Sequence, residues 1–98
     1  MDTDPIIGAT LAKLDIPALN ALQETTLPAV QHYANVILLA PTGSGKTLAF
    51  LLPILQRLNP EVAGVQCLIL TPTRELALQI ERVWQKMGTG FKVSTCVV

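Results

Sequence analysis

The sequence predicts an α/β fold in which three parallel strands with flanking helices form an incomplete sheet. Three apolar runs, at 35–40, 65–70 and 92–98, are nearly continuous, as parallel strands covered on both faces should be. Helical patterns lie between these runs, so the order is strand, helix, strand, helix, strand. This order favours a parallel sheet with right-handed crossover connections.

The composition excludes several other classes of protein. Of the 98 residues, 50% are hydrophobic and 14% are charged, which excludes a disordered chain because disorder needs high charge and few apolar groups. Seven basic residues balance seven acidic ones, so no basic field indicates nucleic acid or an anionic membrane. The apolar runs are far shorter than the ~18 residues of a membrane span, and the first residues do not form a secretory signal. We therefore expect one small domain and no membrane partner.

Short helices are predicted before the first strand. One covers 10–14, and a second begins after Asn20 and continues through Thr26. Asn20 and Gln23 have the spacing of a capping box, in which the Gln23 side chain returns to the Asn20 backbone N–H. A third helix is predicted at 28–33, because the residue before a proline resists the helical conformation.

Two longer helices are predicted between the strands. The first covers 46–58, where Pro53 should kink the helix or break its hydrogen-bond ladder. The second covers 73–87, with a cap at Thr71 before it and Gly88 at its end. Its core-facing positions follow helical spacing: Leu76, Ile80, Val83 and Met87.

The two cysteines, Cys67 and Cys96, lie within apolar stretches and match no zinc spacing or disulfide framework. Free cysteine behaves as a small buried hydrophobic residue, so we expect both side chains in the core. Free thiols indicate a reducing compartment, and a cytoplasmic location is therefore predicted.

The most informative stretch is 40–47, which reads Ala-Pro-Thr-Gly-Ser-Gly-Lys-Thr between a predicted strand and a predicted helix. Successive backbone N–H groups in such a phosphate loop form a nest for an anion, and the helix N-terminus adds its positive dipole end. Gly43 and Gly45 permit backbone angles and a close phosphate approach that a side chain would block. We therefore expect Thr42, Gly43, Ser44 and Gly45 to bind nucleotide phosphates.

The last two residues of the loop carry the predicted catalytic chemistry. Lys46 should reach the β- and γ-phosphates as a point charge, and Thr47 should offer its hydroxyl to Mg²⁺ as the metal ligand. The generic pattern begins with glycine, whereas this chain has Ala40. The alternative is a glycine-rich turn that only joins strand to helix and leaves Lys46 solvated.

Three segments together resemble the DEAD-box RNA helicases. The phosphate loop with Ala40 in place of the first glycine is similar to motif I of that family, and Pro-Thr-Arg-Glu-Leu-Ala at 72–77 matches motif Ia. Gln23, which precedes Lys46 by 23 residues, stands where the glutamine of the family's Q-motif stands. The resemblance covers about 16–98, which is nearly the whole chain.

The resemblance implies an incomplete RecA-like domain that forms the ATP-binding portion of an ATP-dependent RNA helicase. Under this interpretation 1–98 is a partial N-terminal ATP-binding domain, with a Q-motif helical region at 1–34 and a P-loop βαβαβ core at 35–98. ATP and Mg²⁺ would be the cofactors.

The same resemblance implies roles for single residues. Gln23 would read adenine with its amide, in addition to its capping-box role. Thr73 and Arg74 would contact RNA phosphates, which gives binding without a basic surface. For Arg74 the alternative is pairing with a carboxylate such as Glu75, or solvation.

The chain also departs from the family pattern. Leu19 and Asn20 replace the usual proline and Ser or Thr before the glutamine, and no aromatic residue precedes Tyr33 to stack on adenine. The motif Asp-Glu-Ala-Asp does not occur within the 98 residues. Phosphoryl transfer needs a second Mg²⁺ carboxylate and a residue that positions water, so we expect this chain alone to be inactive.

Two other functions remain open from the sequence. One is a different P-loop nucleotide enzyme, such as a small kinase, which would have a lid and acceptor site where this chain has 72–76. The other is a non-catalytic fragment that self-associates, because an unfinished sheet has an open edge that invites pairing.

Overall fold

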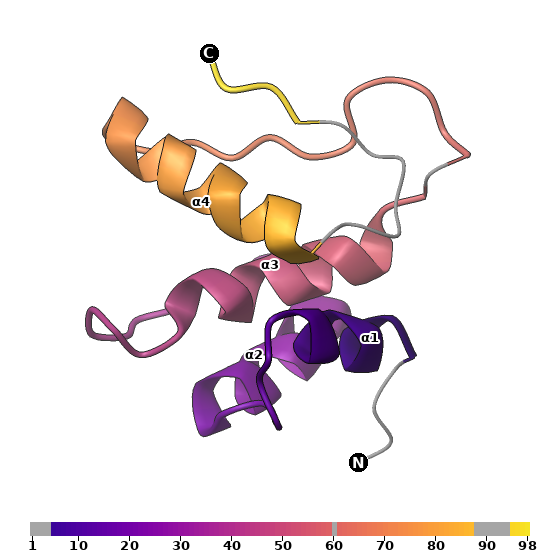
Figure 1. Cartoon of the computed structure of the whole chain (residues 1–98), viewed down its shortest axis with the longest axis vertical. Coiled ribbons are helices and arrows are strands. Elements are labelled where there is room, and N and C mark those ends of the chain that lie inside the picture. The colour runs from indigo at the N-terminus through magenta and orange to yellow at the C-terminus, as the bar shows by residue number, and fades with distance from the viewer. Residues whose placement is uncertain (1–4, 60, 88–94) are drawn as a thin grey trace.

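Four helices and several extended segments make up the described part of the chain. The computed structural model describes residues 5–59, 61–87 and 95–98. The helices are α1 (Pro5–Lys13), α2 (Ala21–His32), α3 (Lys46–Arg57) and α4 (Arg74–Met87). Figure 1 shows α3 in the middle, with α4 on one side and α1 and α2 on the other. The central helix α3 therefore contacts all three of the other helices.

The hydrophobic core is built around α3. Leu51, Leu52 and Leu55 of this helix are fully buried and lie among side chains from α1, α2 and α4. Complete burial of a leucine side chain stabilises a fold by about 1.5–3 kcal/mol. The other buried apolar members of the cluster come from the surrounding helices: Ile7, Leu11, Leu27, Ile80, Trp84 and Met87.

Helix α1 ends in a tight reversal. The helix covers Pro5–Lys13, so the prediction of a short helix at 10–14 placed both of its ends too late. Asp15 has a left-handed backbone with φ 58°, and the Ile16 N–H donates to the Leu11 carbonyl over 2.9 Å. This reversal turns the chain back toward the start of α2, because a left-handed residue ends a helix.

Helix α2 runs without interruption through Pro28. The prediction of a separate helix at 28–33 is wrong, because Ala21–His32 is one helix with the proline inside it. The capping box at its start is confirmed, with Asn20 and Gln23 bonding each other's backbone N–H. At its other end, Arg57 of α3 donates to the Val30 carbonyl over 2.7 Å.

Helix α4 begins one residue later than predicted. The Thr73 hydroxyl accepts a hydrogen bond from the Leu76 N–H over 3.2 Å, so Thr73 caps this helix, and not Thr71. Of the predicted core stripe, Ile80 and Met87 are buried, whereas Leu76 is 37% exposed. Trp84 is buried instead, because it lies one turn after Ile80 on the inward face.

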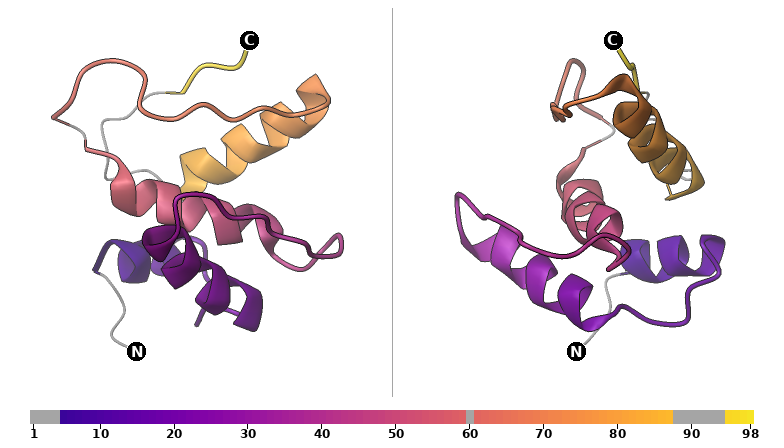
Figure 2. Two further views of the ribbon diagram at one scale, coloured as in Figure 1. Left: turned by 180° about the vertical axis from the view of Figure 1, so that it is seen from behind. Right: turned by 90° about the vertical axis from the view of Figure 1, so that its left-hand side faces the viewer.

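The predicted parallel sheet is wrong for the described residues. No residue within 5–59, 61–87 or 95–98 forms a strand, and the third predicted strand lies partly outside these ranges. The segments at 35–40 and 65–70 are extended but unpaired, and Figure 2 shows them on opposite sides of α3. Parallel strands need neighbours for their backbone hydrogen bonds and cover on both faces, and neither segment has these. Within the described residues the chain is therefore not an α/β parallel sheet, and the predicted βαβαβ order is not formed there.

The side chains of these two segments face water. Ile37 and Leu39 of the first are each 88% exposed, and Val65 and Leu70 of the second are 89% and 84% exposed. Such residues were expected to be the core of the sheet, but the four helices form the core without them. Within the described residues, no helix is long and apolar enough to cross a membrane.

The cysteines are free, as predicted, but they are not buried. Cys67 and Cys96 are both exposed, so their expected place in the core is wrong. Partial desolvation nevertheless raises the pKa of the Cys67 thiol, because its charged form loses contact with water.

Candidate functional site

The phosphate loop turns sharply into α3. Gly43 and Gly45 have φ angles of 82° and 81°, in the left-handed region that other residues rarely adopt. Gly45 is the N-cap of α3 and has no side chain to cap the helix with. Its carbonyl accepts the first helical hydrogen bond, from the Ala49 N–H over 3.1 Å. The loop therefore presents backbone groups, rather than side chains, at the start of the helix.

Two side chains fold back onto the loop and close it. The Ser44 hydroxyl donates to the Pro41 carbonyl over 2.6 Å, and the Lys46 ammonium donates to the Ala40 carbonyl over 3.1 Å. Lys46 is exposed, and so is Thr42, whereas Ser44 is half-buried. Lys46 thus donates to a neutral carbonyl of its own loop while its side chain stays exposed.

The beginning of α2 holds the other side of the loop. The Asn20 amide nitrogen donates to the Ser44 carbonyl over 3.0 Å, and the Gln23 amide nitrogen donates to the Gly45 carbonyl over 3.3 Å. The oxygen of Gln23 accepts from the Asn20 N–H over 3.0 Å, so this side chain, which is only 4% exposed, is fixed at both ends. Residues 22 or more positions apart in sequence therefore form one hydrogen-bonded unit.

The approach of the loop to α2 is too close for a side chain at Gly45. A Cβ atom there would lie 2.7 Å from the Asn20 Nδ2 and 2.8 Å from the Gln23 Nε2. At Gly43, by contrast, nothing lies within 4 Å of a Cβ position. A side chain at Gly45 would therefore have to displace the Asn20 and Gln23 amides in addition to adopting the left-handed angle, whereas a side chain at Gly43 would meet the angle alone.

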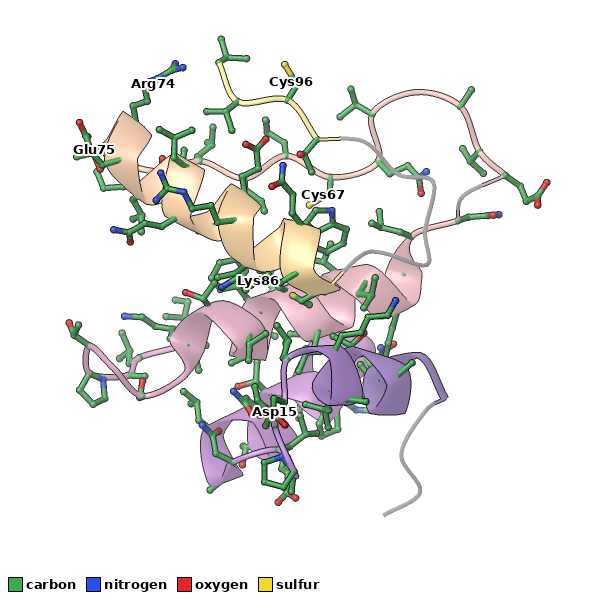
Figure 3. All side chains as sticks on the ribbon, in the orientation of Figure 1. Asp15, Cys67, Arg74, Glu75, Lys86 and Cys96 are labelled. Atoms are coloured by element: carbon green, nitrogen blue, oxygen red, sulfur yellow. The ribbon has the colours of Figure 1, made fainter. Side chains whose placement is uncertain are left out.

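The predicted RNA contacts lie at the start of α4. Thr73 and Arg74 are both exposed, and Figure 3 shows the Arg74 and Glu75 side chains pointing apart and away from α3. The proposed pairing of Arg74 with its neighbour Glu75 is thus not what the structure shows. Helices α3 and α4 begin on the same side of the molecule in Figure 1, so the backbones of Arg74 and of the phosphate loop lie at that end of the molecule.

The predicted magnesium ligand, Thr47, lies at the start of α3. Its side chain is half-buried in the first turn of α3, directly after Lys46. No group of three or more His, Cys, Asp or Glu that could hold a metal occurs within the residues that the structure describes. Thr47 would supply one oxygen ligand of Mg²⁺, and the rest of the coordination would come from waters, substrate phosphates and a carboxylate, because that ion is usually held by one or two carboxylates together with phosphates.

The sequence interpretation missed the role of Asn20. The capping-box spacing predicted its bond to Gln23, but nothing in the spacing indicated that its amide also reaches the loop. The only available signal was the residue type, because an amide can accept and donate at once whereas an ordinary capping carboxylate only accepts.

A glycine-rich loop with left-handed residues before a helix N-terminus is typical of proteins that bind phosphate groups. The family can be stated from comparison with known proteins. The model of the DEAD/DEAH box helicase family matches residues 20–98, and the chain belongs to this family.

Curated relatives agree with this assignment. The chain is 40% identical over 93 residues to the DEAD-box ATP-dependent RNA helicase CshC of Bacillus cereus, which covers 95% of this chain and 24% of that protein. It is 42% identical over 94 residues to the probable ATP-dependent RNA helicase Dbp45A of Drosophila melanogaster, and the alignment covers 96% of this chain and 18% of that protein. For the probable ATP-dependent RNA helicase DDX49 of Homo sapiens the identity is 44% over 72 residues, and the alignment covers 74% of this chain and 15% of that protein. The chain thus spans a quarter or less of these relatives, and no solved structure matches it.

Proposed function

We propose that this chain is the ATP-binding portion of an ATP-dependent RNA helicase. The observation that carries the proposal is the phosphate loop, which is held between the first turn of α3 and the capping box of α2. Membership of the DEAD/DEAH box helicase family supports it, as do relatives named ATP-dependent RNA helicases. None of these relatives is named as a kinase, so nothing favours the small-kinase alternative.

Phosphate binding would use the loop backbone and one cation. Left-handed residues such as Gly43 and Gly45 can turn successive backbone N–H groups toward one anion, and the first N–H groups of a helix have no partner within that helix. Lys46 would exchange its contact with the Ala40 carbonyl for the β- and γ-phosphates of ATP. Exchange of a neutral acceptor for a phosphate strengthens the bond, because both partners are then charged.

Magnesium would bind beside the phosphates through the Thr47 hydroxyl. When bound, the ion would neutralise charge on the β- and γ-phosphates. Thr47 follows Lys46 directly in the first turn of α3, so both side chains start from the same end of the helix. We therefore propose catalytic roles for Lys46 and Thr47 in the protein to which this chain belongs.

Adenine recognition is proposed for Gln23. A primary amide has two N–H groups and two lone pairs on its oxygen. In this structure one N–H is used on the Gly45 carbonyl and one lone pair on the Asn20 N–H. The remaining N–H and lone pair would match the acceptor and donor that adjoin on the edge of adenine, once the side chain, which is 4% exposed in this structure, is reached by the base.

RNA would be bound at the start of α4. The Thr73 hydroxyl and the Arg74 guanidinium are exposed there, next to N–H groups of the first helical turn. Contacts of this kind bind phosphate oxygens and carry no sequence information. The zero net charge of the chain is compatible with such binding, because it needs a few placed donors rather than a basic surface.

Two matched pairs of variants test the function. Titration of the chain with MgATP should give binding that Lys46→Ala weakens at least tenfold and that Lys86→Ala, at an exposed lysine in the last turn of α4, leaves unchanged. Titration with single-stranded RNA should give binding that Arg74→Ala weakens uniformly for all sequences, with Arg82→Ala as the control on the same helix. Equal ATP affinity of the Lys46 and Lys86 variants would contradict the proposal.

A cytoplasmic location and self-association are proposed on separate grounds. Cys67 and Cys96 are free thiols, which favours a reducing compartment. Fractionation of cells that produce the protein tests this location. Exposed apolar side chains in 35–40 and 65–70 support self-association of a chain of this length.

A further inference from the structure

We propose that Asn20 is a positioning residue that aims the backbone N–H groups of the phosphate loop at the nucleotide phosphates. The inference rests on the proposed ATP binding and assigns a specific part of it to a residue outside the loop. Asn20 precedes α2 and lies 24 positions before Ser44, to whose carbonyl it donates over 3.0 Å.

The planarity of the peptide bond connects this contact to the phosphate side of the loop. In a trans peptide the carbonyl and the following N–H point in opposite directions, and no described peptide bond is cis. Because Asn20 holds the Ser44 carbonyl toward α2, the Gly45 N–H must point away from α2. The bond from Gln23 to the Gly45 carbonyl orients the Lys46 N–H in the same way.

An asparagine suits this position because its amide has two different ends. Its oxygen accepts the Gln23 N–H over 2.9 Å, which caps α2, while its nitrogen donates to the loop. An aspartate at the same position would keep the cap and lose the donor, because a carboxylate only accepts. One side chain therefore couples the start of α2 to the peptide that precedes α3.

Gly45 provides independent support for the same arrangement. A Cβ atom at this residue would lie 2.7 Å from the Asn20 Nδ2, which is closer than real contacts of this kind. The loop backbone is thus seated directly on the Asn20 amide. Because Gly45 has no side chain, the Ser44 carbonyl and the Gly45 carbonyl can both accept hydrogen bonds from the start of α2.

The test replaces the amide and keeps the helix. Asn20→Gly removes the donor, adds no charge near the phosphates, and reduces helix capping only slightly because glycine is tolerated at an N-cap. Asn59→Gly is the matched control, because the Asn59 oxygen also accepts a backbone N–H, from Glu61 over 3.0 Å. Asn59 lies beyond the far end of α3 from the loop.

Nuclear magnetic resonance gives the two readouts. In titrations of the chain, Asn20→Gly should weaken MgATP binding about fivefold and adenosine binding less than twofold, since only the phosphates use the aimed N–H groups. Without any ligand, Asn20→Gly should shift the amide resonances of Gly45 and Lys46 as their peptides rotate. Asn59→Gly should change neither the affinities nor these two resonances.

Several results would overturn the inference. If Asn20→Gly keeps the wild-type ATP affinity and the wild-type Gly45 and Lys46 resonances, the amide does not aim the loop, although ATP binding stands. An equal loss of adenosine and ATP affinity would show that Asn20 acts only by capping α2. If the wild-type chain binds no ATP, the proposed function fails, and the ligand-free resonances still decide whether Asn20 orients the loop.

Discussion

The phosphate loop and the extended segments are both irregular in backbone, but they are held in opposite ways. The loop at 40–47 is fixed by hydrogen bonds from its own side chains and from Asn20 and Gln23, the N-cap and the third residue of α2. The segments at 35–40 and 65–70 have apolar side chains that are up to 89% exposed, and they pair with no other segment that the structure describes. Side-chain hydrogen bonds therefore fix the backbone of the candidate site, whereas an apolar sequence alone does not make a segment a strand.

The difference between buried and exposed leucines should be the largest measurable effect. Leu52 of α3 is 1% exposed, whereas Leu39 of the first extended segment is 88% exposed. Leu52→Ala should lower the free energy of unfolding by about 2–5 kcal/mol, because it removes core contacts and leaves a cavity. Leu39→Ala should change that free energy by less than about 0.5 kcal/mol, as is usual for surface positions.

Chemical denaturation of the two variants and the wild type measures both free energies under one condition. The comparison is strict because the same atoms are deleted in each variant. A loss for Leu39→Ala as large as that for Leu52→Ala would show that the first extended segment is packed in solution, contrary to the structure.

A smaller effect separates the three glycines that have positive φ among the described residues. Gly43, Gly45 and Gly64 have φ angles of 82°, 81° and 96°. Substitution by alanine at any of them costs about 1–2 kcal/mol in backbone strain. Gly45→Ala should cost about 1 kcal/mol or more beyond this, because its Cβ would lie 2.7 Å from Asn20 and 2.8 Å from Gln23.

Gly43→Ala and Gly64→Ala provide the reference for strain alone, because nothing lies within 4 Å of either Cβ position. Unfolding by denaturant gives the three free energies. If Gly45→Ala is no more destabilising than Gly64→Ala, the loop does not pack against the Asn20 and Gln23 amides. The contrast between a loop fixed by hydrogen bonds and unpaired extended segments would then not hold.

What the sequence predicted correctly depends on contacts that are close along the chain. The capping box at Asn20 and Gln23, the start of α3 at Lys46, and the end of α4 at Met87 were all found, because capping residues, glycines and helical spacing act within a few residues. The candidate site residues Lys46 and Thr47 were predicted from the same local pattern, and their roles stay predictions.

What the sequence did not predict correctly depends on partners far along the chain. A run such as 65–70 becomes a strand only if another segment offers its backbone groups, and in the described residues none does. The same limit applies within the site, where the contact of Asn20 with Ser44 spans 24 positions. No spacing rule contains such a contact, because its geometry follows from the packing of α2 on α3.

The smallest expected effect on stability comes from a substitution in the exposed segments, although that substitution should clearly reduce self-association. Ile37→Lys places a charge at a side chain that is 88% exposed, so the free energy of unfolding should change by less than about 0.5 kcal/mol.

The apparent mass from light scattering should rise with concentration for the wild type and rise less for the variant, because the charge interrupts an apolar surface. Gln66→Lys within the second segment is unsuitable as a control, since Gln66 bonds Asn59, whereas Gln85→Lys on the exposed side of α4 adds the same charge elsewhere. A wild type that stays monomeric at all concentrations would show that exposed apolar residues in these segments do not attract a second copy.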